Sequence, residues 1–167
     1  MTAWHPGLVT ERRLLVLRHA KSEWPEGVAD HDRPLAKRGR HDAPRVGRWL
    51  ARHDYLPDVV VCSTAQRTRE TWDLVATKLP GTPDVTPDVT FDPRAYGASA
   101  QTLLYLAREL PDERHTALLI AHNPGVSEFA GVGFPTAALA VLTFEGDWPD
   151  LAPGQARLKA FVTPADM

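Results

Sequence analysis

The sequence contains a single cysteine, Cys62, among 167 residues, so the chain cannot form an internal disulfide. Such cysteine usage is typical of a reducing compartment, and we predict a cytoplasmic protein. No apolar run approaches the roughly 20 residues that are needed to span a bilayer. The first residues also lack the apolar stretch of a signal peptide. We therefore expect no membrane partner.

An excess of charge of one sign is also missing. The chain has 19 Lys and Arg against 21 Asp and Glu, a net charge of −2 at pH 7, whereas nucleic-acid-binding surfaces are strongly basic. Neither glycine-rich phosphate loop, GxxxxGK[ST] or GxGxxG after a strand, is present. We expect no nucleic-acid partner, cofactor or metal, and surface positions for the histidines that show no metal-ligand spacing, which are His5, His31, His41, His53 and His115.

What the sequence does contain is an alternation of apolar runs and amphipathic segments over most of its length, which predicts an α/β fold. We expect one domain over residues 1–167, with residues 1–12 as a loose leader. The expected strands are 14–17, 59–62, 117–121, 138–144 and 156–162, with an edge strand near 89–91. The expected helices lie within 36–53, after Ser63 and over 102–110, with a short one after Pro124. The last two strands are predicted to form an antiparallel hairpin.

Three helix starts can be examined from local signals. Pro44 either follows Asp42 at the first position of a helix or lies inside a longer one, and the sequence leaves both open. Ser63 and Gln66 have the spacing of a capping box. Asn123 before Pro124 predicts an N-cap followed by a proline in the first turn.

Three of the expected buried strands end in polar residues that suit an anion. One strand ends at Arg18 and His19, the next at Ser63 with Arg67 one helical turn later, and a third at His122. In open α/β sheets, ligands bind at the carboxyl ends of the strands. Arginine binds phosphate oxygens in pairs and keeps its charge, and helix N-termini favour anions. This pattern predicts a site for a phosphoryl group.

These segments, in this order, resemble the signatures of the histidine phosphatase superfamily, which includes phosphoglycerate mutase. The resemblance covers roughly residues 14–162 and is closest to the short phosphohistidine phosphatases of the SixA type. The segments that carry it are Arg18-His19-Ala20, Arg33-Pro34-Leu35 with Gly39, Ser63 to Thr71, His122-Asn123-Pro124, and Pro135-Thr136-Ala137 before the closing hairpin.

The resemblance implies a three-layer sandwich with a mostly parallel central sheet flanked by helices. It also implies a metal-independent phosphatase in which His19 takes the phosphoryl group onto its ring. Its other catalytic residues would be Arg18, Arg67 and His122, which bind the phosphoryl oxygens and stabilise the charge of transfer. Arg33 and Ser22 are further substrate-binding candidates. The sequence does not show which nitrogen of His19 reacts.

The chain departs from the larger members of that superfamily, in which a Glu protonates the leaving group. Here the segment that ends in Tyr96-Gly97 has no Glu, so Asp92, Tyr96 or no residue supplies the proton. Cleavage of an N-phosphate needs less acid assistance, because protonated imidazole is a better leaving group than an alkoxide. We therefore expect a phosphorylated protein bearing phosphohistidine as the substrate, with a small phosphate ester as the alternative.

Other interpretations make distinct predictions. Cys62 precedes Arg67 at a strand-to-helix turn, as in a cysteine phosphatase, but with four residues between them instead of five. A non-catalytic module that binds phosphohistidine is a second alternative, although it would not need His19. The loop carboxylates Glu23, Glu26 and Asp30 are expected to form a solvated face.

Overall fold

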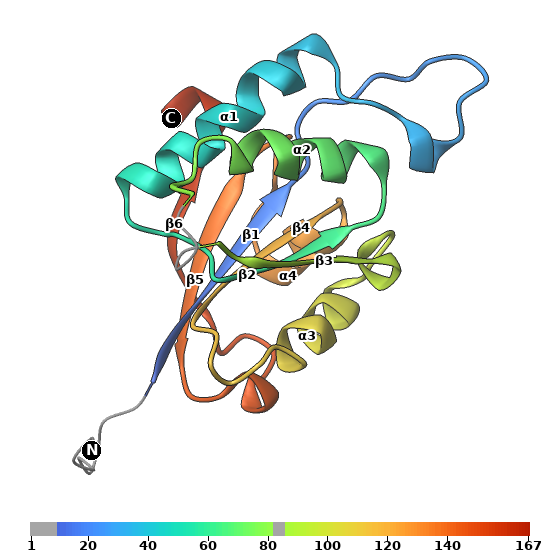
Figure 1. Ribbon diagram of the computed structural model, residues 1–167. Coiled ribbons are helices and arrows are strands. Elements are labelled where there is room, and N and C mark those ends of the chain that lie inside the picture. The colour runs from blue at the N-terminus through green and yellow to red at the C-terminus, as the bar shows by residue number, and fades with distance from the viewer. Residues whose placement is uncertain (1–9, 82–85) are drawn as a thin grey trace.

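The computed structural model describes residues 10–81 and 86–167. In the order β3-β2-β4-β1-β5-β6, six strands form one sheet (Figure 1). The strands are β1 Glu11–Arg18, β2 Val59–Ser63, β3 Asp88–Asp92, β4 Thr116–Ala121, β5 Leu139–Glu145 and β6 Arg157–Val162. β3, β2, β4 and β1 are parallel, whereas β5 and β6 add antiparallel pairs. The predicted mostly parallel sheet with a C-terminal antiparallel hairpin is confirmed.

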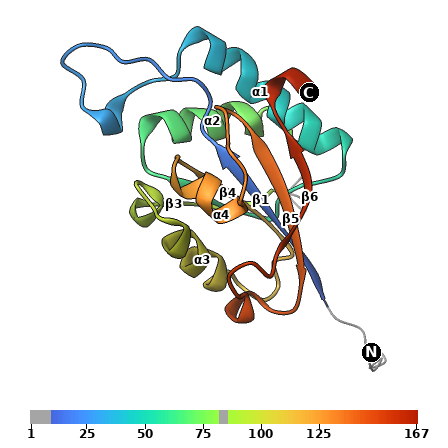
Figure 2. The same cartoon turned by 180° about the vertical axis from the view of Figure 1, so that it is seen from behind.

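Helices cover both faces of this sheet, as the three-layer prediction requires. The helices are α1 Lys37–Arg52, α2 Gln66–Ala76, α3 Ala100–Arg108 and α4 Gly125–Ala130. α1 and α2 lie together on one face, while α3 and α4 cover the other (Figures 1 and 2). None of the helices in the described ranges has both the length and the apolar character to cross a lipid bilayer.

The uniformly apolar strands follow from burial on two faces. In β1, Leu14 and Val16 belong to the core beneath α3 and α4, whereas Leu15 and Leu17 belong to the core beneath α1 and α2. All four side chains are completely buried. Because side chains alternate along a strand, consecutive apolar residues fill two cores at once and fix β1 in the centre of the sheet.

The start of β1 corrects the expected leader. β1 begins at Glu11, so the last two residues of the 1–12 segment belong to the sheet. Arg12 is only 2% exposed, and its guanidinium donates to the carbonyls of Gly146, Asp112 and Arg114. These bonds satisfy the buried charge and hold the strand in place. Thr10 is exposed and precedes the strand, and residues 1–9 of the predicted leader lie outside the described residues.

The structure also decides the three helix starts. α1 runs through Pro44, so the longer helix is correct. The capping box is wrong, because α2 begins at Gln66 with Ala65 as its N-cap, and Ser63 is still the last residue of β2. The Asn123 N-cap is also wrong: Asn123 precedes a cis bond to Pro124, and its side chain bonds elsewhere.

Candidate active site

The polar ends of β1, β2 and β4 meet at one edge of the sheet. β4 lies between β1 and β2, with Arg18 paired to Ala121 and Cys62 paired to Ile120. The residues that follow these pairs are therefore neighbours. The rings of His19 and His122 lie 5.2 Å apart between their centroids. Distant segments of the sequence thus deliver two imidazoles to one place.

The environment of His19 fixes which of its nitrogens can react. Its Nδ1 lies 2.8 Å from the carbonyl oxygen of Ala20. A carbonyl only accepts hydrogen bonds, so Nδ1 carries the proton and donates, and the lone pair of the neutral ring is on Nε2. Burial, and then the positive charges of Arg67 and Arg18, lower the pKa of His19 to about 4. His19 is therefore a neutral imidazole at pH 7, with Nε2 as its nucleophilic atom.

Two arginines are tethered beside this imidazole by their terminal nitrogens. Nη1 of Arg18 donates to the carbonyl of Phe134 at 2.9 Å. Arg67 donates from Nη1 to the carbonyl of Asp30 at 2.7 Å and from Nη2 to its carboxylate at 3.1 Å. Burial, and then the charge of Arg67, lower the pKa of Arg18. The two cations are thus held close together, an arrangement that favours an anion between them.

His122 contributes a further polar atom. Its Nε2 lies 2.7 Å from the hydroxyl oxygen of Ser63, which also accepts a hydrogen bond from the backbone N–H of Ala65. The hydroxyl hydrogen of Ser63 is therefore free to bond to Nε2, and in that arrangement the ring proton of His122 is on Nδ1. Burial, and then the neighbouring His19 and Arg67, lower the pKa of His122 to about 3. Ser63 thus holds a neutral imidazole with Nδ1 as its available donor.

Unsatisfied buried donors mark the centre of the site. Among the described residues, five buried side-chain nitrogen or oxygen atoms have no hydrogen-bond partner, and three of them are Nε of Arg18, Nε of Arg67 and Nδ1 of His122. A buried donor without a partner costs about 1 to 3 kcal/mol. All three belong to residues that adjoin His19, so an anion bound in front of His19 Nε2 would satisfy them.

Arg33 and Ser22 lie in the loop of residues 21–35, which joins β1 to α1. Arg33 donates from Nε to the carbonyl of Glu23, from Nη1 to the carboxylate of Asp30 and from Nη2 to Oγ of Ser22, at 2.9, 3.0 and 2.7 Å. Three of its five donors therefore organise the loop. Their substrate-binding roles stay predictions, and the loop contacts are what the geometry shows.

Asp30 lies on an exposed loop face with Glu23 and Glu26, as expected, but its carboxylate also joins the loop to the site. It accepts hydrogen bonds from Arg33, from Arg67 and, at 2.5 Å, from the hydroxyl of Tyr96. The Tyr96 hydrogen bond, followed by those of the two arginines, holds the pKa of Asp30 well below its usual range. In the sequence, the one feature that could have indicated these contacts is Arg33, which follows Asp30 by three residues. Asp30 orients Arg67 from behind and leaves its Nε free.

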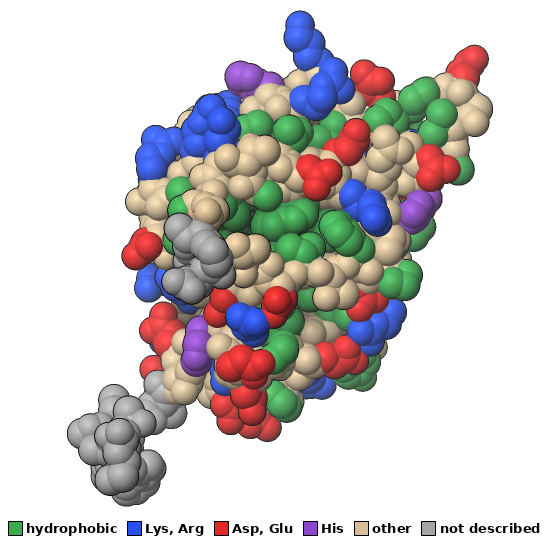
Figure 3. Space-filling view, in the orientation of Figure 1, with side chains coloured by type: hydrophobic (Ala, Val, Ile, Leu, Met, Phe, Trp, Pro, Cys, Tyr) green, Lys and Arg blue, Asp and Glu red, His purple; other side chains and the backbone are tan. Residues whose placement is uncertain are grey.

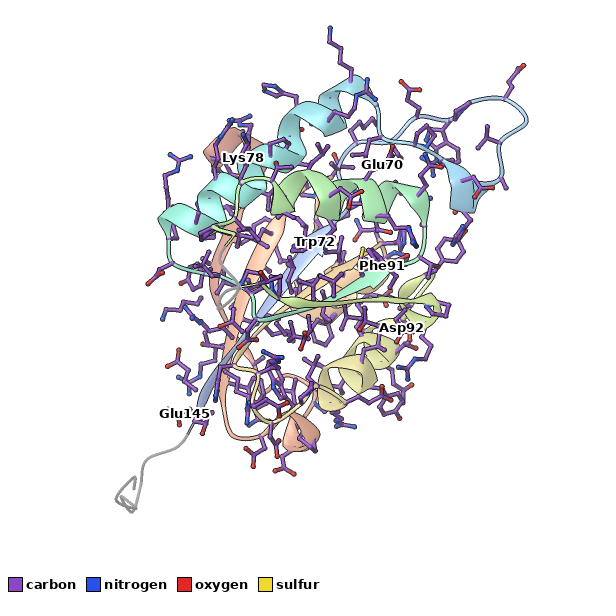
Figure 4. The ribbon with its side chains drawn as sticks, in the orientation of Figure 1. Glu70, Trp72, Lys78, Phe91, Asp92 and Glu145 are labelled. Atoms are coloured by element: carbon purple, nitrogen blue, oxygen red, sulfur yellow. The ribbon has the colours of Figure 1, made fainter. Side chains whose placement is uncertain are left out.

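The two candidate proton donors have different surroundings. Asp92, labelled at the end of β3 in Figure 4, pairs with the Arg94 guanidinium at 2.8 Å and also accepts the Arg94 backbone N–H. These hydrogen bonds lower the pKa of Asp92, so it is an ionised cap of the following turn. The ring of Tyr96 instead lies edge-on to His122, 5.5 Å between centroids. The geometry therefore places Tyr96, and not Asp92, against the site.

α2 supports the site through two side chains beyond Arg67. Thr71 accepts the backbone N–H of Ala20 at 3.0 Å and donates its hydroxyl to the carbonyl of Arg67 at 2.7 Å. Glu70, labelled in Figure 4 on the side of α2 toward the loop, accepts the backbone N–H of Leu35 at 2.7 Å. Both bonds join the turn after His19 and the loop to the helix that carries Arg67.

The histidines expected on the surface differ in their surroundings. His41, His53 and His115 are exposed, whereas His5 lies outside the described residues. His31 is also at the surface, with its side chain 43% exposed, and in addition it bonds to Thr64 at 2.9 Å and lies edge-on to Tyr96. No group of three or more His, Cys, Asp or Glu side chains in the described part of the chain is placed to hold a metal ion.

Cys62 is fully buried in the core beneath α1 and α2. Burial raises the pKa of its thiol to about 12, so the thiolate that a cysteine phosphatase requires does not form near pH 7. We expect the Cys62→Ser variant, and the wild type treated with iodoacetamide, to release phosphate from a phosphorylated substrate at rates within about twofold of the untreated wild type. Loss of activity on either treatment, with the fold intact by circular dichroism, would revive the cysteine mechanism.

A hollow elsewhere in the molecule is separate from this site. A cavity of about 580 Å³ lies between α3, α4 and the loop that joins β5 to β6. Its walls are mainly apolar and include Leu104, Phe129 and Leu151. None of its lining residues is one of the polar groups around His19. The polar groups around His19 thus lie outside this apolar cavity.

Comparison with known proteins agrees with this geometry. Residues 14–119 match the model of the histidine phosphatase superfamily, branch 1. The chain belongs to the histidine phosphatase superfamily. It is 36% identical over 165 residues to an uncharacterized protein of Mycobacterium tuberculosis, covering 89% of this chain and 99% of that relative. It is 32% identical over 178 residues to an uncharacterized chloroplastic protein of Arabidopsis thaliana, covering 95% and 81% of the two.

Solved structures of this superfamily have the same fold. A candidate phosphohistidine phosphatase SixA from Nakamurella multipartitia superposes with a TM-score of 0.80 at 29% identity, over 92% of this chain and 96% of that one. The protein histidine phosphatase SixA complexed with tungstate superposes with a TM-score of 0.78 at 19% identity, over 92% and 97% of the two chains, which shows the fold. The predicted SixA-like resemblance is therefore confirmed.

The buried histidines of this histidine phosphatase predict a pH-dependent stability. Their pKa values of about 4 for His19 and about 3 for His122 lie below the unfolded value of 6.5. Between these limits the unfolded chain binds protons that the native state does not, so stability is lost as the pH falls below 6.5. We expect each histidine to lower the free energy of unfolding by up to about 2 kcal/mol between pH 6.5 and pH 4.5, as measured by urea denaturation.

The matched control is the double variant His19→Ala/His122→Ala, which lacks both groups. Its free energy of unfolding should change clearly less over the same pH range, which lies mostly above the titration of the carboxylates. Equal pH dependence in the two proteins would contradict the assignment of the loss to these two imidazoles.

Proposed function

We propose that this histidine phosphatase hydrolyses phosphohistidine in proteins through a covalent intermediate on His19. The observation that carries the proposal is the arrangement around Nε2 of His19. A neutral imidazole with its lone pair on Nε2 adjoins three buried donors that lack partners, on Arg18, Arg67 and His122. A nucleophile beside unsatisfied donors suits phosphoryl transfer, which needs positioning and charge stabilisation.

The first step forms a bond from His19 Nε2 to phosphorus. The bond from phosphorus to the leaving atom breaks, and the leaving group departs with its electron pair and takes up a proton. In the second step a water molecule attacks phosphorus, the bond to Nε2 breaks, and inorganic phosphate leaves. The proton stays on Nδ1 throughout, and Nδ1 donates it as a hydrogen bond to the carbonyl oxygen of Ala20. Covalent catalysis thus divides one difficult displacement into two.

Arg18 and Arg67 would bind the equatorial oxygens of the phosphoryl group, since their guanidinium groups are anchored through Nη atoms and each keeps a buried Nε without a partner. His122 would donate from Nδ1 to an oxygen on which charge develops. Because these donors are fixed before the substrate binds, their reorganisation cost in the transition state is small. Removing one such donor typically costs about 10²-fold to 10³-fold in rate.

The leaving group supports phosphohistidine over an alkyl ester. Asp92 is an ionised cap, and the hydroxyl of Tyr96 is engaged with Asp30. An imidazole leaving group needs little help from a protein acid, since solvent can protonate it. The likeness to the Nakamurella SixA structure, at 29% identity, supports the same substrate class.

The test compares phosphate release from a phosphohistidine peptide, the corresponding phosphoserine peptide and a simple alkyl phosphate, each with and without EDTA. We expect the phosphohistidine peptide to be hydrolysed at least about tenfold more efficiently than the other two, at a rate that EDTA does not change. Comparable kcat/KM for the three would favour the small-ester alternative. Binding of the peptide without phosphate release would favour a recognition module.

A further inference from the structure

Trp24 is the most exposed large apolar side chain among the described residues, with 76% of its surface accessible. It lies in the loop of residues 21–35, which projects beside the active site (Figure 1). Single exposed apolar residues are common and need no explanation. Trp24 differs because its ring is held in place, which the contacts of the loop show.

The guanidinium of Arg33 lies over the indole ring of Trp24, 3.2 Å from the ring centroid. Arg33 is itself buried and fixed by hydrogen bonds to Glu23, Ser22 and Asp30. One face of the indole is thus covered by a fixed cation while the ring stays accessible. Because the side chain is ordered in advance, a partner that contacts it loses little additional entropy.

Trp24 is also connected to the phosphate site through a short series of contacts. Trp24 stacks on Arg33, Arg33 donates to Asp30, and Asp30 accepts from Arg67. Arg67 therefore lies three contacts from the indole, and a phosphoryl group bound at Arg67 lies four. A small phosphate ester ends before that point. An extended polypeptide spans about 3.3 Å per residue, so the residues that flank a phosphorylated side chain reach the indole.

The charge of the loop indicates what kind of side chain suits it. The loop of residues 21–35 contains four acidic residues, Glu23, Glu26, Asp30 and Asp32, against two basic ones, Lys21 and Arg33, so it carries a net negative charge. In Figure 3, hydrophobic and acidic side chains gather on the projecting loop at the upper right. An exposed indole among carboxylates attracts a cationic side chain through its π face and through charge.

We propose that Trp24 and the acidic loop around it form a docking surface for a basic polypeptide segment that flanks the phosphohistidine. This inference rests on the proposed function and names the feature of the substrate that the site recognises beyond the phosphoryl group. Trp24 contacts the flanking Lys or Arg, and Glu26 adds attraction at the outer part of the loop. Neither residue touches the reacting atoms.

The experiment uses phosphohistidine peptides of equal length with basic or acidic flanks, and phenyl phosphate as a small substrate. For the wild type, we expect kcat/KM to be about tenfold higher for the peptide with basic flanks than for the peptide with acidic flanks. Trp24→Ala should lower kcat/KM for the basic peptide about threefold to tenfold, through a higher KM. The kcat/KM of the same variant for phenyl phosphate should stay within twofold of the wild type. Trp24→Phe should restore most of the loss, because the aromatic face returns. Glu26→Lys should weaken the preference for basic flanks.

Leu158→Ala is the matched control, because Leu158 is also exposed, at 46%, but lies on β6. Leu158→Ala should leave kcat/KM unchanged for both the basic peptide and phenyl phosphate. Equal losses on the peptide and on phenyl phosphate in Trp24→Ala would show that Trp24 only supports Arg33 and would overturn the docking surface. An unchanged KM for the basic peptide would overturn it as well.

A binding measurement separates this inference from the proposed function. Calorimetry with the unphosphorylated basic peptide needs no turnover. Binding that weakens threefold to tenfold in Trp24→Ala, without phosphate release from any peptide, would support the docking surface and refute the phosphohistidine phosphatase. If the peptides release phosphate but Trp24→Ala changes neither peptide binding nor KM, the phosphohistidine phosphatase would be supported and the docking surface refuted.

Discussion

Replacing His19 with alanine is expected to lower kcat for a phosphohistidine peptide by at least about 10³-fold, because the variant has no atom that can take the phosphoryl group. The donors on Arg18, Arg67 and His122 remain, so binding of inorganic phosphate should persist within about tenfold. Initial rates of phosphate release and calorimetric titration with phosphate measure the two quantities. The separation of catalysis from binding is the signature of a lost nucleophile.

Two control variants make this result specific. His115→Ala removes an exposed imidazole that precedes β4, at the opposite end of this strand from His122, and should leave kcat unchanged. His122→Ala keeps the nucleophile but removes a donor, so its loss should be smaller, about 10²-fold to 10³-fold. A His19→Ala enzyme that retained more than about a tenth of wild-type kcat would mean that another group is phosphorylated or that water attacks directly.

A second large effect is expected from Gly39→Ala, in the first turns of α1. A Cβ atom on Gly39 would lie 2.1 Å from the carbonyl oxygen of Lys21, a backbone atom that cannot rotate away. Lys21 follows His19 by two residues, so the turn after His19 must shift. We expect the free energy of unfolding to fall by about 1 to 3 kcal/mol and kcat/KM to fall about tenfold to 10²-fold, because small displacements of reacting groups are costly.

Gly47→Ala provides the matched control on the same helix. Its Cβ would lie 2.3 Å from the carbonyl oxygen of Val75, where α1 crosses α2, away from the turn after His19. Both variants should lose similar stability in urea, but only Gly39→Ala should lose substantial activity at a temperature where both are folded. Equal activity of the two variants would contradict the close contact of Gly39 with the catalytic turn.

The sequence was sufficient to predict the sheet and to bring its polar strand ends to one edge. The runs at β1, β2 and β4 are apolar throughout because both faces of the sheet are covered, and this signal needs no tertiary information. Since parallel strands end at one edge, Arg18, His19 and His122 could be expected together. Here the structure brings them together, with the two imidazoles 5.2 Å apart.

The contacts of the loop could not be predicted in the same way. Asp30 looks like any solvated carboxylate in the sequence, and its contact with Arg67 crosses 37 residues. The reactive nitrogen of His19 depends on a carbonyl oxygen 2.8 Å away, and the role of Ser63 depends on its distance from His122. The failed capping box has the same cause, because the hydroxyl of Ser63 is engaged at the end of a strand and not at a helix start.

The most direct test of the account is the intact mass of the protein after rapid mixing with a phosphohistidine peptide and quenching at alkaline pH. We predict a transient adduct with the mass of one phosphoryl group, lost on acidification, absent from His19→Ala and mapped to His19 after proteolysis. Phosphate release from the peptide without any adduct, or an adduct that persists in His19→Ala, would contradict the covalent mechanism.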